Sequence, residues 1–413
     1  MDEKQINFLQ RKTVRVLTSG QILGGFALGS TLSIGSLLAA DLSGSAAWAG
    51  SAATFSTLGA AAWAMPMARL ANTRGRRVSL AAGAGLAILG ASLVITSAAV
   101  HFFPLLLIAL FLLGGGSAAG LQARFAAVDL SGSSSRSTGR DLATVVWATT
   151  IGAVIGPNLF GPGEIVGGWL GLPTMTGPFV FTIAAQLSAT VVFWFGLRPD
   201  PLLVAKEIDS AKGGVKPKTS FKTAFTTLRK YPVAAFAVTA IALSHMVMVA
   251  VMSMTPLHMH HMGYDLVVVG FTISLHIAGM YAFSPIFGWL SDKIGKVKVV
   301  LLGQVIYVFA LGIAGFGQHD RTLVTLGLFL LGLGWSASTV AASALLAQTL
   351  PIAEKTNVQG LSDTSMNLAG ALGGAVSGSI LASIAFLGLN AAAFIPVALI
   401  VTFSAVAHIR RDR

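Results

Sequence analysis

Two kinds of side chain that bind soft metal ions gather in one short window of this sequence. Seven of the twelve methionines and five of the eight histidines lie between His245 and Met280. An even distribution would place about one of each there. Thioether sulfur and imidazole are ligands that suit Cu(I), and Asp265 is the only carboxylate in the window. The composition of this window therefore predicts a path for a soft metal ion, which we expect to be copper.

The spacing of these residues indicates that they share helix faces. His245, Met248 and Met252 are separated by three and four residues, and His276 and Met280 by four, so each set falls on one side of a helix. Two facing stripes would then run from the outer surface to the middle of a membrane. Three further histidines are expected in the outer loop above them as a capture site: His258, His260 and His261. The alternative is that the methionines only pack and the loop histidines are solvated.

The composition of the whole chain is typical of an integral membrane protein. Apolar residues make up 54% and charged residues 10% of the 413 positions, with a mean hydropathy of +0.78. Soluble domains carry about 25% charged residues. Apolar runs of about 20 residues, long enough to cross a bilayer, recur throughout the chain. We predict an all-α fold with twelve transmembrane helices, at about 16–40, 46–68, 78–100, 103–128, 142–160, 178–197, 232–256, 266–290, 299–317, 322–349, 358–386 and 390–408.

The distribution of positive charge predicts the orientation of these helices. With the N-terminus in the cytoplasm, 25 of the 27 Lys and Arg residues fall on the cytoplasmic side. The exceptions are Arg124, in or near the fourth helix, and Arg321, between the ninth and the tenth. The positive-inside rule then places both termini in the cytoplasm. The net charge of +12 is a topology signal, and no basic soluble domain indicates a nucleic-acid partner.

A polar segment divides the chain into two halves of six helices each. It runs from Arg198 to Tyr231, is rich in lysine, proline and glycine, and is predicted to be a cytoplasmic linker. A short amphipathic helix is expected near Phe221–Leu228. The predicted domains are residues 1–197, a linker at 198–231, and residues 232–413.

A weak repeat relates the two halves. Ala68–Arg77 follows the second predicted helix and Gly288–Lys296 follows the eighth, and both fit the pattern small-x-Leu-small-Asp/Asn-x-x-Gly-basic. This pattern resembles the loop motif of the major facilitator superfamily, which implies a two-half transporter fold over the whole chain. The second copy keeps the motif residues Gly288, Asp292 and Gly295. In the superfamily the acidic residue meets the positive end of a helix from the other half, which is the role expected for Asp292.

The first copy of the loop motif departs from the pattern. Ala68 stands in place of glycine and Asn72 in place of aspartate. An amide carries no negative charge, so we expect the corresponding lock in the first half to be weaker.

The fifth predicted helix carries a second motif, formed by Gly152, Gly156, Pro157 and Gly161. Small residues four apart allow helices to approach closely, and proline bends the segment. The motif resembles that of the drug antiporters of the superfamily and favours export. Leu110 stands where those antiporters carry an arginine on the fourth helix, which argues against their standard mechanism.

Met-xxx-Met on the seventh predicted helix, followed by His-xxx-Met on the eighth, resembles the CcoA-like copper importers of the same superfamily. Met248 and Met252 match the first pair, and His276 and Met280 match the second. The resemblance implies that these four residues carry copper inward for the assembly of copper enzymes. His245 lies outside the resemblance but on the same predicted face.

Ionisable residues within predicted membrane helices are functional candidates. Arg124 lies on the inner part of the fourth helix, and Asp363 and Asn367 lie four residues apart on the eleventh. These two helices meet at the cytoplasmic gate in the superfamily, so we expect an Arg124–Asp363 gate pair, with Asp363 as the site of proton coupling. The alternative is that both charged side chains extend to the cytoplasmic surface.

The sequence thus favours a copper importer that works by alternating access in the cytoplasmic membrane of a prokaryote. Copper would be the transported substrate, with no tightly bound cofactor, and the chain is expected to be a monomer in the bilayer. The alternatives are a proton-coupled exporter of drugs or metabolites and a membrane metal sensor. No arrangement of residues typical of an enzyme is recognised.

Overall fold

The structure of the protein is a computed structural model that describes residues 3–45, 48, 51–130, 138–211, 221–264 and 266–409. Within these ranges, the side chains of residues 27–33, 36–37, 40, 156–158, 160, 211, 221, 257, 260–261, 266–267 and 405–409 are not described.

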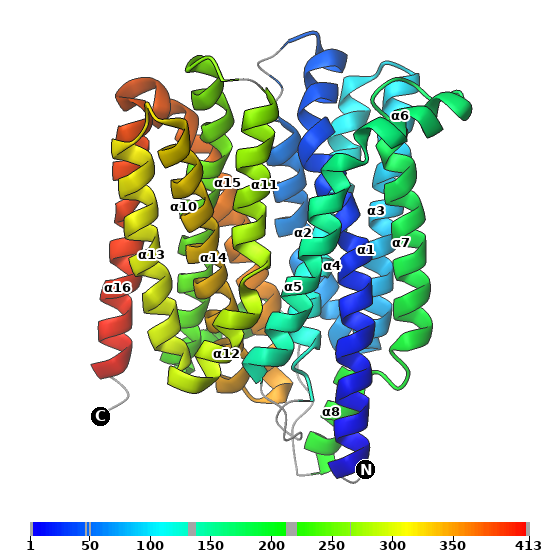
Figure 1. Ribbon diagram of the computed structural model, residues 1–413. Helices are drawn as coiled ribbons and strands as arrows, with labels where there is room; N and C mark the ends of the chain where they lie inside the picture. The colour runs from blue at the N-terminus through cyan, green and yellow to red at the C-terminus, as the bar shows by residue number, and fades with distance from the viewer. Residues whose placement is uncertain are drawn as a thin grey trace. The chain divides into compact units, whose positions relative to one another are not determined.

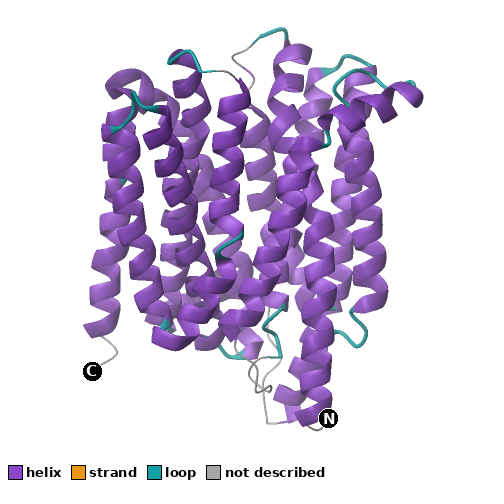
Figure 2. Ribbon diagram, in the orientation of Figure 1, coloured by secondary structure: helices purple, strands orange, loops and turns teal. Residues whose placement is uncertain are grey.

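The regular structure of the described residues is entirely helical (Figure 2). The helices, labelled as in Figure 1, are α1 (Glu3–Ser43), α2 (Ser51–Arg74), α3 (Arg76–Ala99), α4 (Phe103–Ala126), α5 (Thr138–Asn158), α6 (Phe160–Trp169), α7 (Gly177–Gly196), α8 (Pro201–Ala211), α9 (Phe221–Lys230), α10 (Pro232–His261), α11 (Leu266–Tyr281), α12 (Ser284–Ile294), α13 (Lys296–Phe316), α14 (Arg321–Thr349), α15 (Ile352–Ala392) and α16 (Phe394–Ile409). The prediction of an all-α protein is confirmed.

Many of these helices are long and apolar enough to cross a membrane. Eight such helical stretches occur in the described part of the chain. The last of them, Ile352–Ser404, has 53 residues, enough for two crossings of about 20 residues each. Non-helical backbone angles at Ile384 and Ala385 interrupt α15 there. The second-to-last helix was predicted over 358–386, and its predicted end falls at this interruption.

The chain forms two compact units, each with its own core. One comprises residues 1–136, 148–224 and 352–364, and the other residues 137–147, 225–351 and 365–413. In the first unit α3 packs on α4 and α7, around a buried cluster that includes Leu106, Leu110 and Phe179. In the second unit α14 packs on α10, α11 and α13, around a cluster centred on Tyr307 and Trp335.

Helix α10 is longer than the sequence pattern suggested. The prediction ended this helix at residue 256, with the apolar run, but Pro256 lies inside α10 and the helix continues to His261. Gly263 ends it instead, with a positive φ of 82° and a hydrogen bond from the Tyr264 amide to the Met259 carbonyl. This is the glycine C-cap geometry. His258, His260 and His261, expected in a loop, are therefore on the last turn of a helix.

The linker also contains a helix that the sequence did not reveal. The expected amphipathic helix near Phe221–Leu228 corresponds to α9, but α8 was not predicted. One small apolar cluster holds α8 against α1 and the turn that follows α4; it is formed by Leu9, Leu130, Val204 and Ala205. Because this cluster unites residues almost 200 positions apart, it could not be read from local composition.

Candidate functional site

His276 is the predicted metal ligand with the most distinctive environment. It lies on α11 and is fully buried, and its Nδ1 atom is 2.7 Å from the Leu328 carbonyl oxygen on α14. A carbonyl oxygen only accepts, so Nδ1 carries the proton and the neutral ring presents its lone pair at Nε2. That Nε2 atom is buried with no hydrogen-bond partner among the described residues. Metal-bound histidines are commonly oriented in this way, with the second ring nitrogen donating to a carbonyl.

Two of the three predicted methionine ligands lie in the same core cluster of the second unit. Met248 and Met280 are 3% and 6% exposed, and Met252 packs against the same cluster from a partly buried position. Tyr307 and Trp335 belong to the same cluster. The structure therefore brings sulfur from α10 and α11 into one cluster, where each methionine also serves as a packing residue.

His245 has a different hydrogen-bonding role from His276. The indole nitrogen of Trp335 donates to Nδ1 of His245 at 3.0 Å. Because that nitrogen accepts, the proton of a neutral His245 ring is on Nε2. In this arrangement the indole of Trp335 occupies Nδ1 of His245, and the assignment of His245 as a metal ligand stays a prediction.

His258 is held in place by its neighbours and is not a freely solvated side chain. Its Nε2 atom lies 2.8 Å from the Gln318 carbonyl oxygen, and its ring stacks on Phe386 with centroids 4.2 Å apart. The side chains of His260 and His261 lie outside the described residues. Of the three histidines of the predicted capture site, only the side chain of His258 is described. It contacts the loop that precedes α14.

No group of three or more His, Asp or Glu side chains arranged for a metal ion occurs in the described part of the chain. Methionine is not among these residue types. This absence therefore does not concern a site in which thioether sulfur and one imidazole bind a soft metal ion.

Arg124 and Asp363 form a buried ion pair. A guanidinium nitrogen of Arg124, on α4, donates to the Asp363 carboxylate, on α15, at 2.5 Å. Their side chains are 2% and 0% exposed. Neither side chain extends to the surface, so the alternative, in which Arg124 and Asp363 both reach the cytoplasmic surface, does not hold. Asn367 lies one turn further along α15 and is also buried.

A second buried charge network was missed from the sequence. Arg76, at the first position of α3, donates to Asp129 at 2.8 Å and to Gln359 at 2.8 Å. Lys355, one turn before Gln359 on α15, is buried as well. The sequence analysis included Arg76 only as part of the Ala68–Arg77 loop motif and gave no role to Asp129, although a carboxylate directly after an apolar helix was an available signal. The pairing spans 53 and 283 residues and cannot be read from local spacing.

Asp292 lies at the positive end of a helix. Its carboxylate accepts hydrogen bonds from the backbone nitrogens of Gly139 and Arg140, at 3.2 and 3.1 Å, in the first turn of α5. Gly288 approaches the same helix so closely that an added Cβ would overlap Ala143. Gly295, with a φ of 99°, makes the turn into α13. The motif residues therefore hold the α12–α13 turn against the start of α5.

In the first copy of the motif, the carboxylate of the residue that immediately precedes α8 occupies the corresponding role. Asp200 accepts a hydrogen bond from the backbone nitrogen of Arg77, at the start of α3, at 2.8 Å. Lys206, one and a half turns along α8, donates to the Asn72 backbone and side-chain oxygens. The weaker contact expected at the first loop motif was inferred from Asn72 alone. In the structure, Asp200 and Lys206 of the linker bring charged side chains to this loop.

The glycines of the fifth predicted helix differ in their surroundings. A Cβ added at Gly152 would lie within 3 Å of the Gly25 backbone on α1, so the two helices are in close contact here. Gly161 has open space around it and belongs to α6. The surroundings of Gly156 and the side chain of Pro157 are not described, although the backbone of both residues is helical.

The sequence model described as Major Facilitator Superfamily matches residues 17–280 and 267–413 of this chain. The chain belongs to the major facilitator superfamily. Members are membrane transport proteins, so this chain is a multi-pass secondary transporter and not an enzyme. It is 36% identical over 392 residues to the uncharacterized MFS-type transporter YdeG of Bacillus subtilis, covering 94% of this chain and 90% of that one. It is 27% identical to the riboflavin transporter RfnT of Brucella anthropi, with 94% of each chain covered.

Solved structures show the same major facilitator fold. The human organic anion transporter MFSD10 aligns with a TM-score of 0.72 at 15% identity, covering 96% of this chain and 99% of that one. A bacterial homologue of the iron transporter ferroportin, in an outward-facing state, aligns with a TM-score of 0.69 at 15% identity, covering 97% and 100%. At 15% identity the similarity establishes the fold and does not identify the transported substrate.

Proposed function

We propose that this major facilitator protein imports copper across the cytoplasmic membrane of a prokaryote. The ion would pass along the sulfur and imidazole ligands of α10 and α11: Met248, Met252, His276 and Met280. Import would proceed by alternating access, in which the two halves of the transporter rock around a central site.

The single observation that supports copper as the substrate most strongly is the buried Nε2 atom of His276, which has no hydrogen-bond partner among the described residues. Leaving a buried polar atom without a partner costs about 1–3 kcal/mol, and a bound metal ion would offset that penalty. Met280 lies one helical turn from His276, at the distance at which side chains on one face meet. Thioether and neutral imidazole together favour Cu(I) over Mg²⁺, Ca²⁺ or Mn²⁺, which prefer oxygen.

We also propose that the Arg124–Asp363 pair controls the transport cycle. A buried ion pair that loses one partner leaves a charge in a medium of low dielectric constant, which is destabilising by about 3–5 kcal/mol. Protonation of Asp363 would remove its negative charge and weaken the pair. Proton entry at this residue is therefore a physical means of coupling the ion pair to a proton gradient.

A second candidate function is the transport of a small organic solute. The riboflavin transporter RfnT is similar over almost the full length of both chains, and the close contact at Gly152 is the feature that resembles proton-coupled exporters. For this function, His276 would be a structural residue bound to Leu328, and the methionines would only fill the core.

Transport by the purified protein in liposomes separates the two functions. Copper uptake is measured with a trapped Cu(I) chelator, and riboflavin movement is measured in the same vesicles by its fluorescence. We expect copper uptake that depends on His276 and no riboflavin flux above empty vesicles. Riboflavin flux without copper uptake would refute the proposed cargo.

A further inference from the structure

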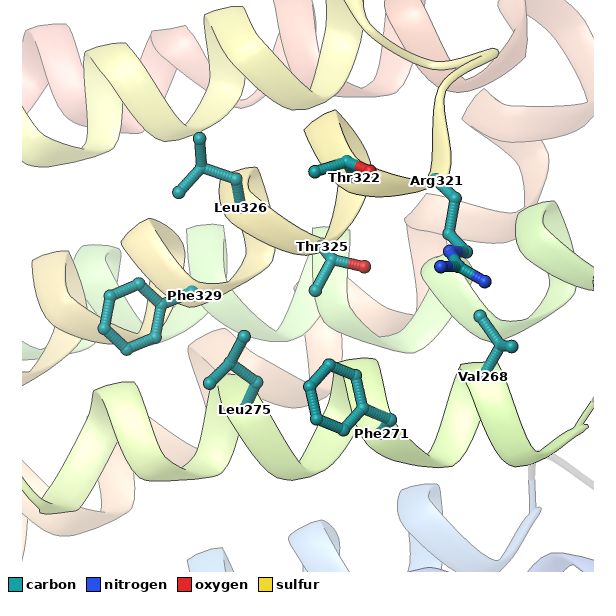
Figure 3. Close-up of a pocket in the computed structure, with 8 residues that line it drawn as sticks. All are labelled: Val268, Phe271, Leu275, Arg321, Thr322, Thr325, Leu326 and Phe329. Atoms are coloured by element: carbon teal, nitrogen blue, oxygen red, sulfur yellow. The ribbon is translucent and has the colours of Figure 1, made fainter.

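A groove about 550 Å³ in volume runs between α11 and α14 in the second unit. Figure 3 shows its two walls: Phe271 and Leu275 project from α11, and Leu326 and Phe329 from α14. Arg321 lies at one end, where α14 begins, and its side chain extends toward α11. The groove is thus apolar along its length and cationic at one end.

The apolar walls of the groove are open to the surroundings. Phe271 is 64% exposed and Leu326 is 41% exposed. The hydroxyl group of Thr325, which lines the groove, is hydrogen bonded to that of Thr272 at 2.8 Å. In a chain that spans a membrane, such a surface faces hydrocarbon or a molecule with a hydrocarbon part.

Arg321 is the unusual residue of this groove. It is exposed, and its guanidinium makes no hydrogen bond or ion pair with any described residue. The nearest carboxylate in sequence, Asp320, accepts from the Thr322 and Leu323 nitrogens as the N-cap of α14. The distribution of the other cations predicts that Arg321 lies on the side of the membrane opposite the linker, where Lys and Arg are otherwise rare.

The dimensions of the groove match one leaflet of a bilayer. Arg321 and Phe329 are eight residues apart on one helix, which corresponds to about 12 Å at 1.5 Å per residue. Half of a hydrocarbon core of about 30 Å is about 15 Å. A guanidinium at the end of such a groove is at the level of the lipid phosphates, and guanidinium groups bind phosphate through paired hydrogen bonds.

We propose that the α11–α14 groove binds one anionic glycerophospholipid of the outer leaflet. Its acyl chain lies along Phe271, Leu275, Leu326 and Phe329, and its phosphate is bound by Arg321 with the Thr322 hydroxyl beside it. The proposal does not depend on the identity of the transported cargo. It makes the packing of α11 on α14, and hence the position of His276, sensitive to the lipid composition of the membrane.

Native mass spectrometry of the full-length protein in detergent tests this site. Phosphatidylglycerol and phosphatidylcholine with identical chains are titrated in parallel, with glycerol 3-phosphate as a water-soluble probe of the headgroup alone. We expect tighter binding of phosphatidylglycerol than of phosphatidylcholine, and no saturable binding of glycerol 3-phosphate. Arg321→Ala is expected to weaken phosphatidylglycerol binding about fivefold, the effect of one cation at a membrane surface.

Two further variants complete the test. Leu326→Trp fills the groove from an exposed position and is expected to weaken binding of both lipids, whereas Arg69→Ala, an exposed arginine of the first unit, is expected to change neither. Equal effects of Arg321→Ala and Arg69→Ala would overturn the proposal. Saturable binding of glycerol 3-phosphate at the phosphatidylglycerol affinity would also overturn it, because the groove would then hold a soluble anion.

Discussion

The Nδ1 atom of His276 lies 2.7 Å from the carbonyl oxygen of Leu328, and this contact fixes the orientation and the tautomer of a fully buried imidazole. The opposite arrangement occurs at His245, whose Nδ1 atom accepts from Trp335. Two histidines of the same predicted metal path therefore have different chemical roles. Only His276 presents a lone pair for which the described structure provides no partner.

Replacing Met248 or Met252 by leucine is expected to reduce copper transport at least tenfold while the protein still folds. Leucine keeps the volume and apolarity of the cluster, so the free energy of unfolding should fall by less than about 1.5 kcal/mol. The loss of transport would follow from removal of the thioether. Copper uptake and thermal unfolding are measured on the same preparations.

The matched control is Met65→Leu, a buried methionine of the first unit. It should unfold like the other two variants and retain full transport. If all three variants transport copper at the wild-type rate, the methionines of α10 are packing residues.

Exchanging Arg124 and Asp363 tests whether they act as a pair. Each single change, Arg124→Asp or Asp363→Arg, places two like charges in a buried position and should lower transport at least tenfold. The double exchange restores opposite charges and is expected to recover part of that loss. Purely additive losses would show that the two residues act independently.

Asp200→Ala is expected to lower the free energy of unfolding by about 1 kcal/mol, because it removes the acceptor for backbone nitrogens at the start of α3 and at the start of α8. Lys206→Met should also lower the free energy of unfolding, because it removes the hydrogen bonds from Lys206 to Asn72. Glu207→Ala, an exposed neighbour on α8, is the control and should have no measurable effect. Faster proteolysis of the linker in Asp200→Ala and Lys206→Met, but not in Glu207→Ala, would show that these contacts hold α8 against the loop between α2 and α3.

Gly152→Ala is expected to destabilise the protein by about 1–3 kcal/mol, because its Cβ would overlap backbone atoms of α1 that cannot rotate away. Gly161→Ala has open space around it and should be neutral or stabilising, since alanine is the better helix former. Thermal unfolding in detergent compares the two. Equal effects would mean that the close contact at Gly152 does not limit stability.

Hydropathy and charge predicted the helical membrane fold because they act locally, and the loop motif at Gly288–Lys296 indicated the superfamily by resemblance. The Arg124–Asp363 contact could be anticipated because an ion inside an apolar helix needs a partner. Local patterns failed where the deciding contact was distant. Helix α10 passes through Pro256, and the Gly263 cap that ends it was an available signal in the sequence. Arg76–Asp129 and Asp200–Arg77 join residues 53 and 123 positions apart. Helix α8 packs through Val204 and Ala205 on Leu9, which is almost 200 positions away.

Uptake of radioactive copper into liposomes that contain the purified protein tests the central claim most directly. Wild type, His276→Ala and the exposed-histidine control His101→Ala are compared at equal protein content and with a trapped Cu(I) chelator. We predict saturable uptake by wild type and by His101→Ala, and a loss of at least tenfold in His276→Ala at every copper concentration. Copper uptake by His276→Ala equal to that of wild type, or no uptake by any of the three proteins, would contradict the account.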